Sequence, residues 1–177
     1  MELVLDVKFS AKVEQIMREC KKFTDEKATQ IDEKGFGNYV TNVDLNIDRF
    51  LRAELVKIVD SGFITEELEP VNGKKYVWVI DPIDGTTNFI YGLDYAISVG
   101  LKKDGELIFG AIYAPEKDWF YYAIKGQGSY KKTSEGITKL HIEPAKTKNG
   151  LIITGVPYDR SKSDNIFEIN KKMVKYC

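Results

Sequence analysis

Apolar residues in the first third of the chain recur with the period of α-helices. Between residues 9 and 23 they return every three or four positions with Lys, Arg and Glu between them, which predicts an amphipathic helix capped by Asp6 or Ser10. A second helix is predicted for residues 44–59. Apolar side chains again line one face there, and Thr41-Asn42-Val43-Asp44 has the spacing of a capping box.

Beyond these helices the apolar period changes to alternate positions, which is typical of β-strands. Short strands are predicted at residues 63–64, 76–80, 95–101, 107–113, 119–124, 126–130 and 140–142. Asp-Gly turns between apolar runs favour hairpins, so we expect a mostly antiparallel sheet with the two helices covering one face. Residues 24–40 have no periodicity and contain two glycines, which predicts a polar loop.

The last part of the chain has a different pattern. Residues 151–155 resemble a strand of a parallel sheet, and residues 163–176 a helix with one apolar side. The expected fold class is therefore α+β. We expect residues 1–149 to form a helix-plus-antiparallel-sheet domain that carries the metal site, and residues 150–177 to form the first strand and helix of a second, incomplete α/β layer.

Composition restricts the partners and the setting. The 177 residues include 26 Lys and Arg against 27 Asp and Glu, and without a basic stripe no nucleic-acid partner is indicated. The two cysteines, Cys20 and Cys177, make no disulfide framework, which favours a reducing, cytoplasmic location. A signal peptide and an apolar run of transmembrane length are both lacking, so no membrane association is expected.

The segment from Asp81 to Phe89 has the strongest chemical content. An apolar strand runs into Asp81, a second acid follows at Asp84, and a Gly-Thr-Thr-Asn turn then opens a helix. Upstream, Glu66 follows another short strand. Mg²⁺ prefers carboxylate and carbonyl oxygens, and backbone N–H groups at a helix start can hold a phosphate. The pattern therefore predicts a site for a divalent cation and a phosphate.

These residues also resemble a known family. Asp81-Pro82-Ile83-Asp84-Gly85-Thr86-Thr87-Asn88-Phe89, with Ile64-Thr65-Glu66-Glu67 upstream, closely resembles the signature of the inositol monophosphatases. The resemblance extends over roughly residues 8–155 and includes Val40-Thr41-Asn42-Val43-Asp44. It implies a layered α/β sugar-phosphatase fold and a Mg²⁺-dependent, lithium-sensitive enzyme. Thr87-Asn88-Phe89 favours the inositol-phosphate branch over the branch acting on nucleotide bisphosphates.

The resemblance also implies residue roles, a substrate and a cofactor. The metal ligands would be Glu66, Asp81, the carbonyl of Ile83, and Asp84. The catalytic residues would be Glu66, Thr86 and Asp44, with Thr86 and Asp44 positioning the attacking water. The phosphate would be bound by Asp84, Gly85, Thr86 and Thr87, and Lys34 matches a loop lysine near the metals. The cofactor would be Mg²⁺, the substrate a small phosphate monoester, and the assembly a homodimer.

Other interpretations of the same residues exist. Asp44 alone could be part of a helix cap, Asp81-Pro82 a strand-ending turn, and the acids after Thr65 a solvated loop. The occurrence of all these residues in this order favours the cation and phosphate site over these separate interpretations. Family chains continue into a segment with a late Asp that completes the second metal site, so the isolated 177 residues are expected to show weak or absent turnover. The alternatives are a fragment or a short form that retains metal binding without catalysis, and an activity of the fructose-1,6-bisphosphatase type.

Overall fold

The structure is a computed structural model, and it describes residues 3–25, 28–35, 38–142 and 163–173. Two helices come before the large sheet in the sequence and lie along one face of it, α1 (Val7–Glu19) and α3 (Asn42–Leu55). The single helical turn α2 (Lys21–Thr24) lies between them in the sequence. The N-cap of α1 is Asp6, whose Oδ1 accepts a hydrogen bond from the Phe9 amide at 2.9 Å. Ser10 instead donates to the Val7 carbonyl.

The predicted capping box at the start of α3 is confirmed. The Thr41 side chain accepts from the amide of Asp44, and the Asp44 side chain accepts from the amide of Thr41. The helix ends at Leu55, earlier than the predicted residue 59. After it, the amides of Lys57 and Ile58 bond to carbonyls three residues back, which is the tighter geometry of a fraying last turn.

The loop prediction for residues 24–40 was wrong in its second half. There β1 (Ile31–Gly35) and β2 (Asn38–Thr41) form an antiparallel pair with its own register. Side chains from Ile31 to Lys34 are all exposed, so this strand has no buried face and leaves no alternating pattern in the sequence. Backbone pairing alone defines it.

The predicted, mostly antiparallel sheet is confirmed, with seven strands in sequential order among the described residues. The strand predicted at residues 140–142 was wrong in its bounds, because the last strand ends at Leu140. Its members are β3 (Ser61–Thr65), β4 (Tyr76–Asp84), β5 (Ala96–Lys103), β6 (Glu106–Ala114), β7 (Trp119–Ile124), β8 (Gly128–Thr133) and β9 (Gly136–Leu140). All neighbouring pairs are antiparallel except β3 and β4, which are parallel. The connections between β4 and β5 and between β6 and β7 contain the short helices α4 (Thr86–Ile90) and η1 (Pro115–Lys117).

Strand β4 continues farther than expected. It includes Asp81, Pro82 and Asp84 instead of stopping at residue 80. Asp81 pairs with Ser98 and Asp84 with Ala96, so β4 has one residue more than β5 over this step. This bulge changes the direction of the acidic end of the strand.

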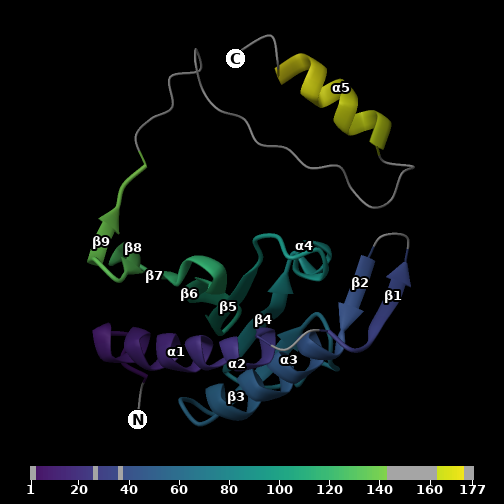
Figure 1. Cartoon of the computed structure of the whole chain (residues 1–177). Coiled ribbons are helices and arrows are strands. Elements are labelled where there is room, and N and C mark those ends of the chain that lie inside the picture. The colour runs from purple at the N-terminus through teal and green to yellow at the C-terminus, as the bar shows by residue number, and fades with distance from the viewer. Residues whose placement is uncertain (1–2, 26–27, 36–37, 143–162, 174–177) are drawn as a thin grey trace.

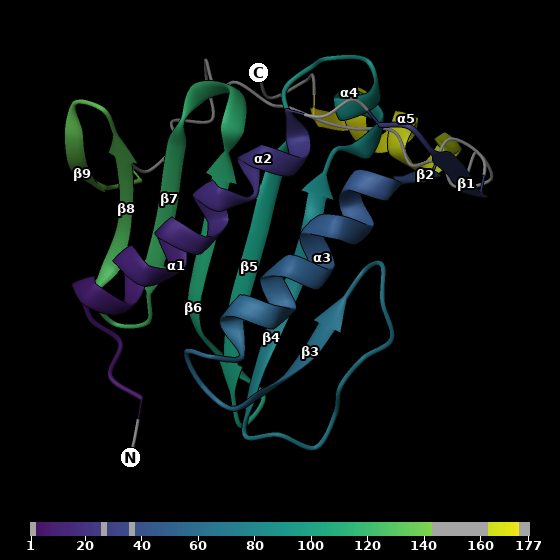
Figure 2. The ribbon, with the colours of Figure 1, turned by 60° about the horizontal axis from the view of Figure 1, so that its bottom comes forward.

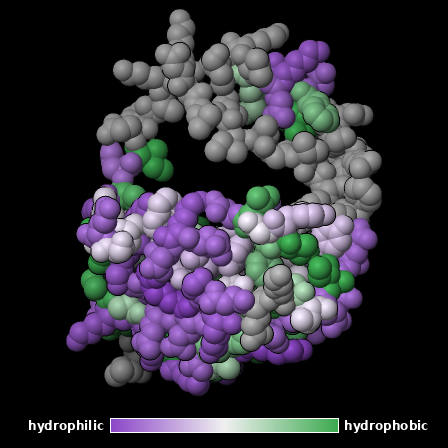
Figure 3. Space-filling model, viewed as in Figure 1, coloured by the Kyte–Doolittle hydropathy of each residue, from purple (hydrophilic) through white to green (hydrophobic). Residues whose placement is uncertain are grey.

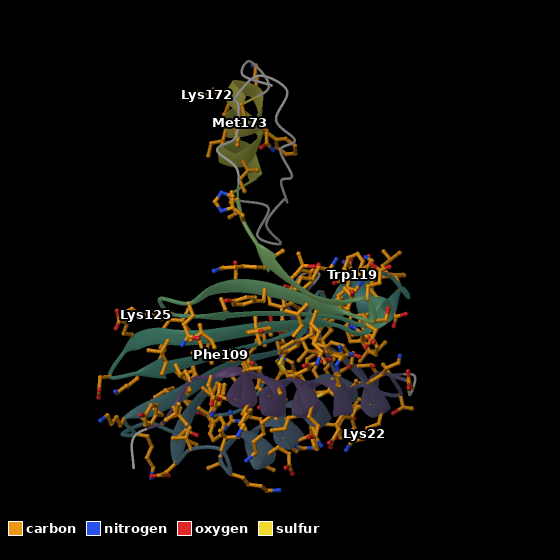
Figure 4. All side chains as sticks on the ribbon, turned by 90° about the vertical axis from the view of Figure 1, so that its left-hand side faces the viewer. Lys22, Phe109, Trp119, Lys125, Lys172 and Met173 are labelled. Carbon is orange, nitrogen blue, oxygen red and sulfur yellow. The ribbon has the colours of Figure 1, made fainter. Side chains whose placement is uncertain are left out.

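The hydrophobic core lies between the helices and one face of the sheet, as Figures 1 and 2 show. Phe9 of α1 stacks on Trp78 with ring centroids 6.3 Å apart and meets the edge of Phe109 at 5.0 Å. Figure 4 shows Phe109 on the helix-covered side of the sheet. The opposite face bears exposed apolar side chains such as Leu107 and Ile112.

The C-terminal expectations are tested only in part. The predicted helix is present as α5 (Ser163–Met173), and its apolar residues Phe167 and Ile169 are exposed. The predicted strand at 151–155 and the boundary between residues 149 and 150 lie outside the described residues. Within the described ranges, none of the helices has the length and apolar character needed to cross a bilayer.

Candidate active site

Acidic side chains gather where the parallel strands β3 and β4 end. Thr65 pairs with Ile80, so Glu66 and Asp81 are the next residues on adjacent strands. Parallel strands bring their carboxyl ends to the same sheet edge, and the predicted proximity of these two acids follows from that pairing. Asp84 also lies at this end of the sheet, three residues beyond Asp81 along β4.

Asp81 is the electrostatic centre of this group. Burial raises its pKa from 3.8 to about 7, with further contributions from the negative charges of Glu66, Asp84, Asp44 and Glu67. Its Oδ1 is buried and has no hydrogen-bond partner among the described residues. Asp81 as a whole is half-buried, and a partly buried carboxylate surrounded by like charges is costly unless a cation neutralises it.

Asp44 caps helix α3 and also contacts Thr86, whereas its predicted role in positioning water stays a prediction. It is almost fully buried, and its Oδ2 accepts from the Thr41 amide at 2.9 Å, which completes the helix cap. Its Oδ1 lies 3.1 Å from Thr86 Oγ1, which is also 3.1 Å from the Ile83 carbonyl oxygen. The structure thus brings Asp44, Thr86 and Ile83 together.

The turn that holds Thr86 depends on Gly85. Gly85 has φ 96° and ψ 45°, a left-handed conformation that residues with a Cβ adopt at a cost. Its carbonyl accepts from the Phe89 amide at 2.9 Å and so closes the first turn of α4. Thr87 also lies in this turn. Phosphate contacts by Asp84, Gly85, Thr86 and Thr87 stay predictions.

Lys34 reaches the site from β1 and contacts an acid for which the sequence suggested no separate role. Its Nζ lies 2.5 Å from Glu67 Oε2, and the Glu67 side chain is only 3% exposed. Burial raises the pKa of Glu67 even though the Lys34 ammonium opposes that shift. The Glu-Glu doublet after β3 was the available signal for Glu67, but its partner is 33 positions away and becomes visible only in the fold.

The donor set fits a hard divalent cation, although the ligands are not preassembled. No three His, Cys, Asp or Glu side chains in the described ranges converge closely enough to hold an ion as they stand. Glu66 and Asp84 are exposed, so their side chains can rotate, and the buried Asp81 Oδ1 lacks a partner. Carboxylate and carbonyl oxygens are the ligands that Mg²⁺ prefers.

Comparison with known proteins assigns the chain to a family. The profile of the inositol monophosphatase family matches residues 2–176. The chain belongs to this family. An inositol-1-monophosphatase of Rhizobium meliloti is 33% identical over 141 residues, covering 77% of this chain and 52% of that protein. A fructose-1,6-bisphosphatase/inositol-1-monophosphatase of Aquifex aeolicus is 33% identical over 159 residues, covering 88% of this chain and 58% of that protein.

The fold of the inositol monophosphatase family is equally evident from a solved structure. The crystal structure of the extragenic suppressor protein suhB from Bartonella henselae matches with a TM-score of 0.82 at 25% identity, covering 94% of this chain and 66% of that chain. This likeness confirms the predicted layered α+β class. The chain spans about half the length of the curated relatives it matches.

Proposed function

We propose that this chain belongs to a Mg²⁺-dependent phosphomonoesterase that hydrolyses inositol monophosphate or a related sugar phosphate. The observation that carries the proposal is Asp81, a half-buried carboxylate whose buried Oδ1 is unpaired among the described residues and whose pKa is raised beside four further acids. Glu66, Asp81, the Ile83 carbonyl and Asp84 would hold the ion. When bound, Mg²⁺ neutralises phosphate oxygens and lowers the pKa of coordinated water.

Thr86 and Asp44 would orient the attacking water. The two neighbours of Thr86 Oγ1, Asp44 Oδ1 and the Ile83 carbonyl, are both acceptors, so the hydroxyl acts as the donor toward them. The lone pairs of Oγ1 therefore remain available to accept a hydrogen bond from a water molecule. That water would then present its own lone pair to the phosphorus atom.

Phosphate release from inositol 1-phosphate, with and without Mg²⁺, tests the proposal, together with calorimetric titration of Mg²⁺. We expect Asp84→Asn to weaken Mg²⁺ binding by about tenfold or more and to abolish whatever Mg²⁺-dependent release the unmodified chain shows. Asp104→Asn is the matched control, because Asp104 lies in the β5–β6 turn with φ 51°, which Asn also tolerates. Unchanged Mg²⁺ binding and release in Asp84→Asn would refute the metal role. Mg²⁺ binding without any phosphate release would instead favour the non-catalytic form.

The second candidate substrate is fructose 1,6-bisphosphate, because the Aquifex relative is named for both activities. The two substrates are separated by comparing kcat/KM for each in the same assay. Lithium inhibition belongs to the proposal as well, and adding LiCl to this assay tests it.

The setting and assembly expected from the sequence are also proposals. A cavity of about 440 Å³ beside α4 is lined by apolar residues including Ile31, Phe89 and Leu93, with Asp25 and Glu116 also in its wall. Figure 3 shows hydrophobic residues gathered around α4. Leu93 is 58% exposed, which supports self-association at this surface. Sedimentation equilibrium of the chain and of Leu93→Glu tests the homodimer.

A cytoplasmic location is proposed from the cysteine content, with Cys20 buried as a free thiol.

A further inference from the structure

Helix α3 carries a stripe of charged residues that extends past the residues assigned to the site. Asp44, Asp48 and Arg52 are spaced four positions apart, which places them along one side of the helix. Asp44 lies at the first turn and contacts Thr86. The Asp48 side chain is fully buried, and that of Arg52 is 16% exposed. The second and third members of this stripe therefore also point into the protein.

Arg52 bonds to a loop that follows β3. Its Nη2 donates to Thr65 Oγ1 at 2.6 Å and to the Leu68 carbonyl at 3.0 Å, and its Nη1 donates to the Glu69 carbonyl at 2.9 Å. Thr65 Oγ1 also accepts from the Leu68 amide at 3.2 Å, which closes the loop on itself. One guanidinium thus bonds both ends of the segment 65–69.

Asp48 fixes the orientation of this guanidinium. Its Oδ1 accepts from Arg52 Nε at 2.9 Å, and the guanidinium also lies over the Phe63 ring, 5.5 Å from the centroid. A buried ion pair adds little net stability compared with an apolar pair of the same volume. The planar guanidinium of arginine instead contributes directional hydrogen bonds, because its N–H groups hold several acceptors in one fixed geometry.

The loop between the two bonded ends contains both Glu66 and Glu67. In the part of the chain that the structure describes, the hydrogen bonds of Arg52 to this loop go to neither Glu. They go to the Thr65 hydroxyl before the two Glu residues and to the backbone carbonyls of Leu68 and Glu69 after them. We propose that Arg52, oriented by Asp48, is a positioning residue that fixes the 65–69 loop so that Glu66 faces Asp81 for cation binding. This inference rests on the proposed function, since it assigns a support to the same site.

Two readouts on the intact chain test this role: Mg²⁺ affinity by calorimetry, and amide hydrogen exchange at Leu68. We expect Arg52→Gln to weaken Mg²⁺ binding by about tenfold or more, the range seen when residues supporting metal ligands are removed. Exchange at Leu68 should accelerate in parallel. Arg52→Lys should fail to restore either, because an ammonium retains the charge without the fork. Arg49→Gln, which removes the same charge from an exposed position of α3, should leave both unchanged.

Thr65→Val provides a second variant in case Arg52→Gln does not fold, since it removes only the hydroxyl that joins Arg52 and Leu68. It should weaken Mg²⁺ binding, while Thr65→Ser should not. Unchanged Leu68 exchange in Arg52→Gln or Thr65→Val would overturn the proposal, as would faster exchange with unaltered Mg²⁺ affinity. If the unmodified chain binds no Mg²⁺, the proposed function fails, and the positioning role for cation binding is overturned with it. Leu68 exchange would then report only whether Arg52 orders the loop.

Discussion

Thr86 and Asp44 are 42 positions apart in the chain, yet Thr86 Oγ1 lies 3.1 Å from Asp44 Oδ1. The contact joins the first turn of α3 to the turn after β4. Because Asp44 is also the acidic member of the α3 capping box, the start of the helix and the candidate active site share one carboxylate.

Thr86→Val should remove the hydroxyl without changing the size of the side chain. We expect a loss of about 1–3 kcal/mol in the free energy of unfolding, because the variant removes the donor to Asp44 Oδ1, an acceptor on a buried residue. We expect a far larger effect on phosphate release if Oγ1 orients the water. Urea unfolding and phosphate release would be measured together, with Thr86→Ser as the control that keeps the hydroxyl. Equal activity of the Val and Ser variants would contradict the role.

The raised pKa of Asp81 predicts that the stability of the metal-free chain depends on pH. Its pKa is 3.8 ordinarily and about 7 in the folded chain, so the folded state holds the proton more tightly. The contribution of this tighter proton binding to the free energy of unfolding is fully present below about pH 4 and is lost as the pH rises through about 7. Asp81→Asn should therefore raise the free energy of unfolding at pH 8 and change it little at pH 4.

The measurement is urea unfolding in EDTA at both pH values, with Asp104→Asn as the control. The same variant should lose the stabilisation that Mg²⁺ gives the unmodified chain at pH 8. An equal effect of Asp81→Asn at both pH values would show that its charge is not the cause.

Gly85→Ala should separate backbone strain from phosphate binding. Gly85 and Gly105 have φ values of 96° and 86°, so Ala at either position should cost about 1–2 kcal/mol in the free energy of unfolding. Neither Cβ would clash, since the nearest neighbour at Gly85 is 3.5 Å away and Gly105 has none within 4 Å. Only Gly85→Ala should also raise KM for the phosphate substrate. Equal KM values for the two variants would argue against a phosphate contact there.

Lys34→Gln should leave the Glu67 carboxylate without its cation in a position that is 3% exposed. An unpaired buried acceptor costs about 1–3 kcal/mol, whereas Lys57→Gln, which breaks the exposed Glu54–Lys57 pair, should cost about 0–1 kcal/mol. The loss in Lys34→Gln should shrink at lower pH, because protonating Glu67 removes its charge. Thermal unfolding across pH measures this, and Glu67→Gln added to Lys34→Gln should recover stability. A loss independent of pH would place the cause elsewhere.

Local residue patterns were sufficient to predict much of the secondary structure of this protein. The capping box of Thr41 and Asp44, the α1 helix and most strands of the large sheet follow from periodicity and short-range hydrogen bonding. Strand β9 is the exception, because its side chains are all exposed and leave no alternating pattern. The acidic segment from Asp81 to Asp84 is recognisable because its residues are close together in the chain. Local sequence alone therefore predicts the chemistry of a hard cation at this segment.

Contacts between distant segments account for what the sequence left open. The exposed strand β1 leaves no periodic signal, and the ion pair of Lys34 with Glu67 depends on where the β1–β2 pair lies. The bulge in β4, the bonds from Arg52 to the loop after β3 and the raised pKa of Asp81 are likewise products of folding. Periodicity reports only whether a residue faces the core. The identity of its neighbours, and hence its charge state, depends on which strands and helices pack together.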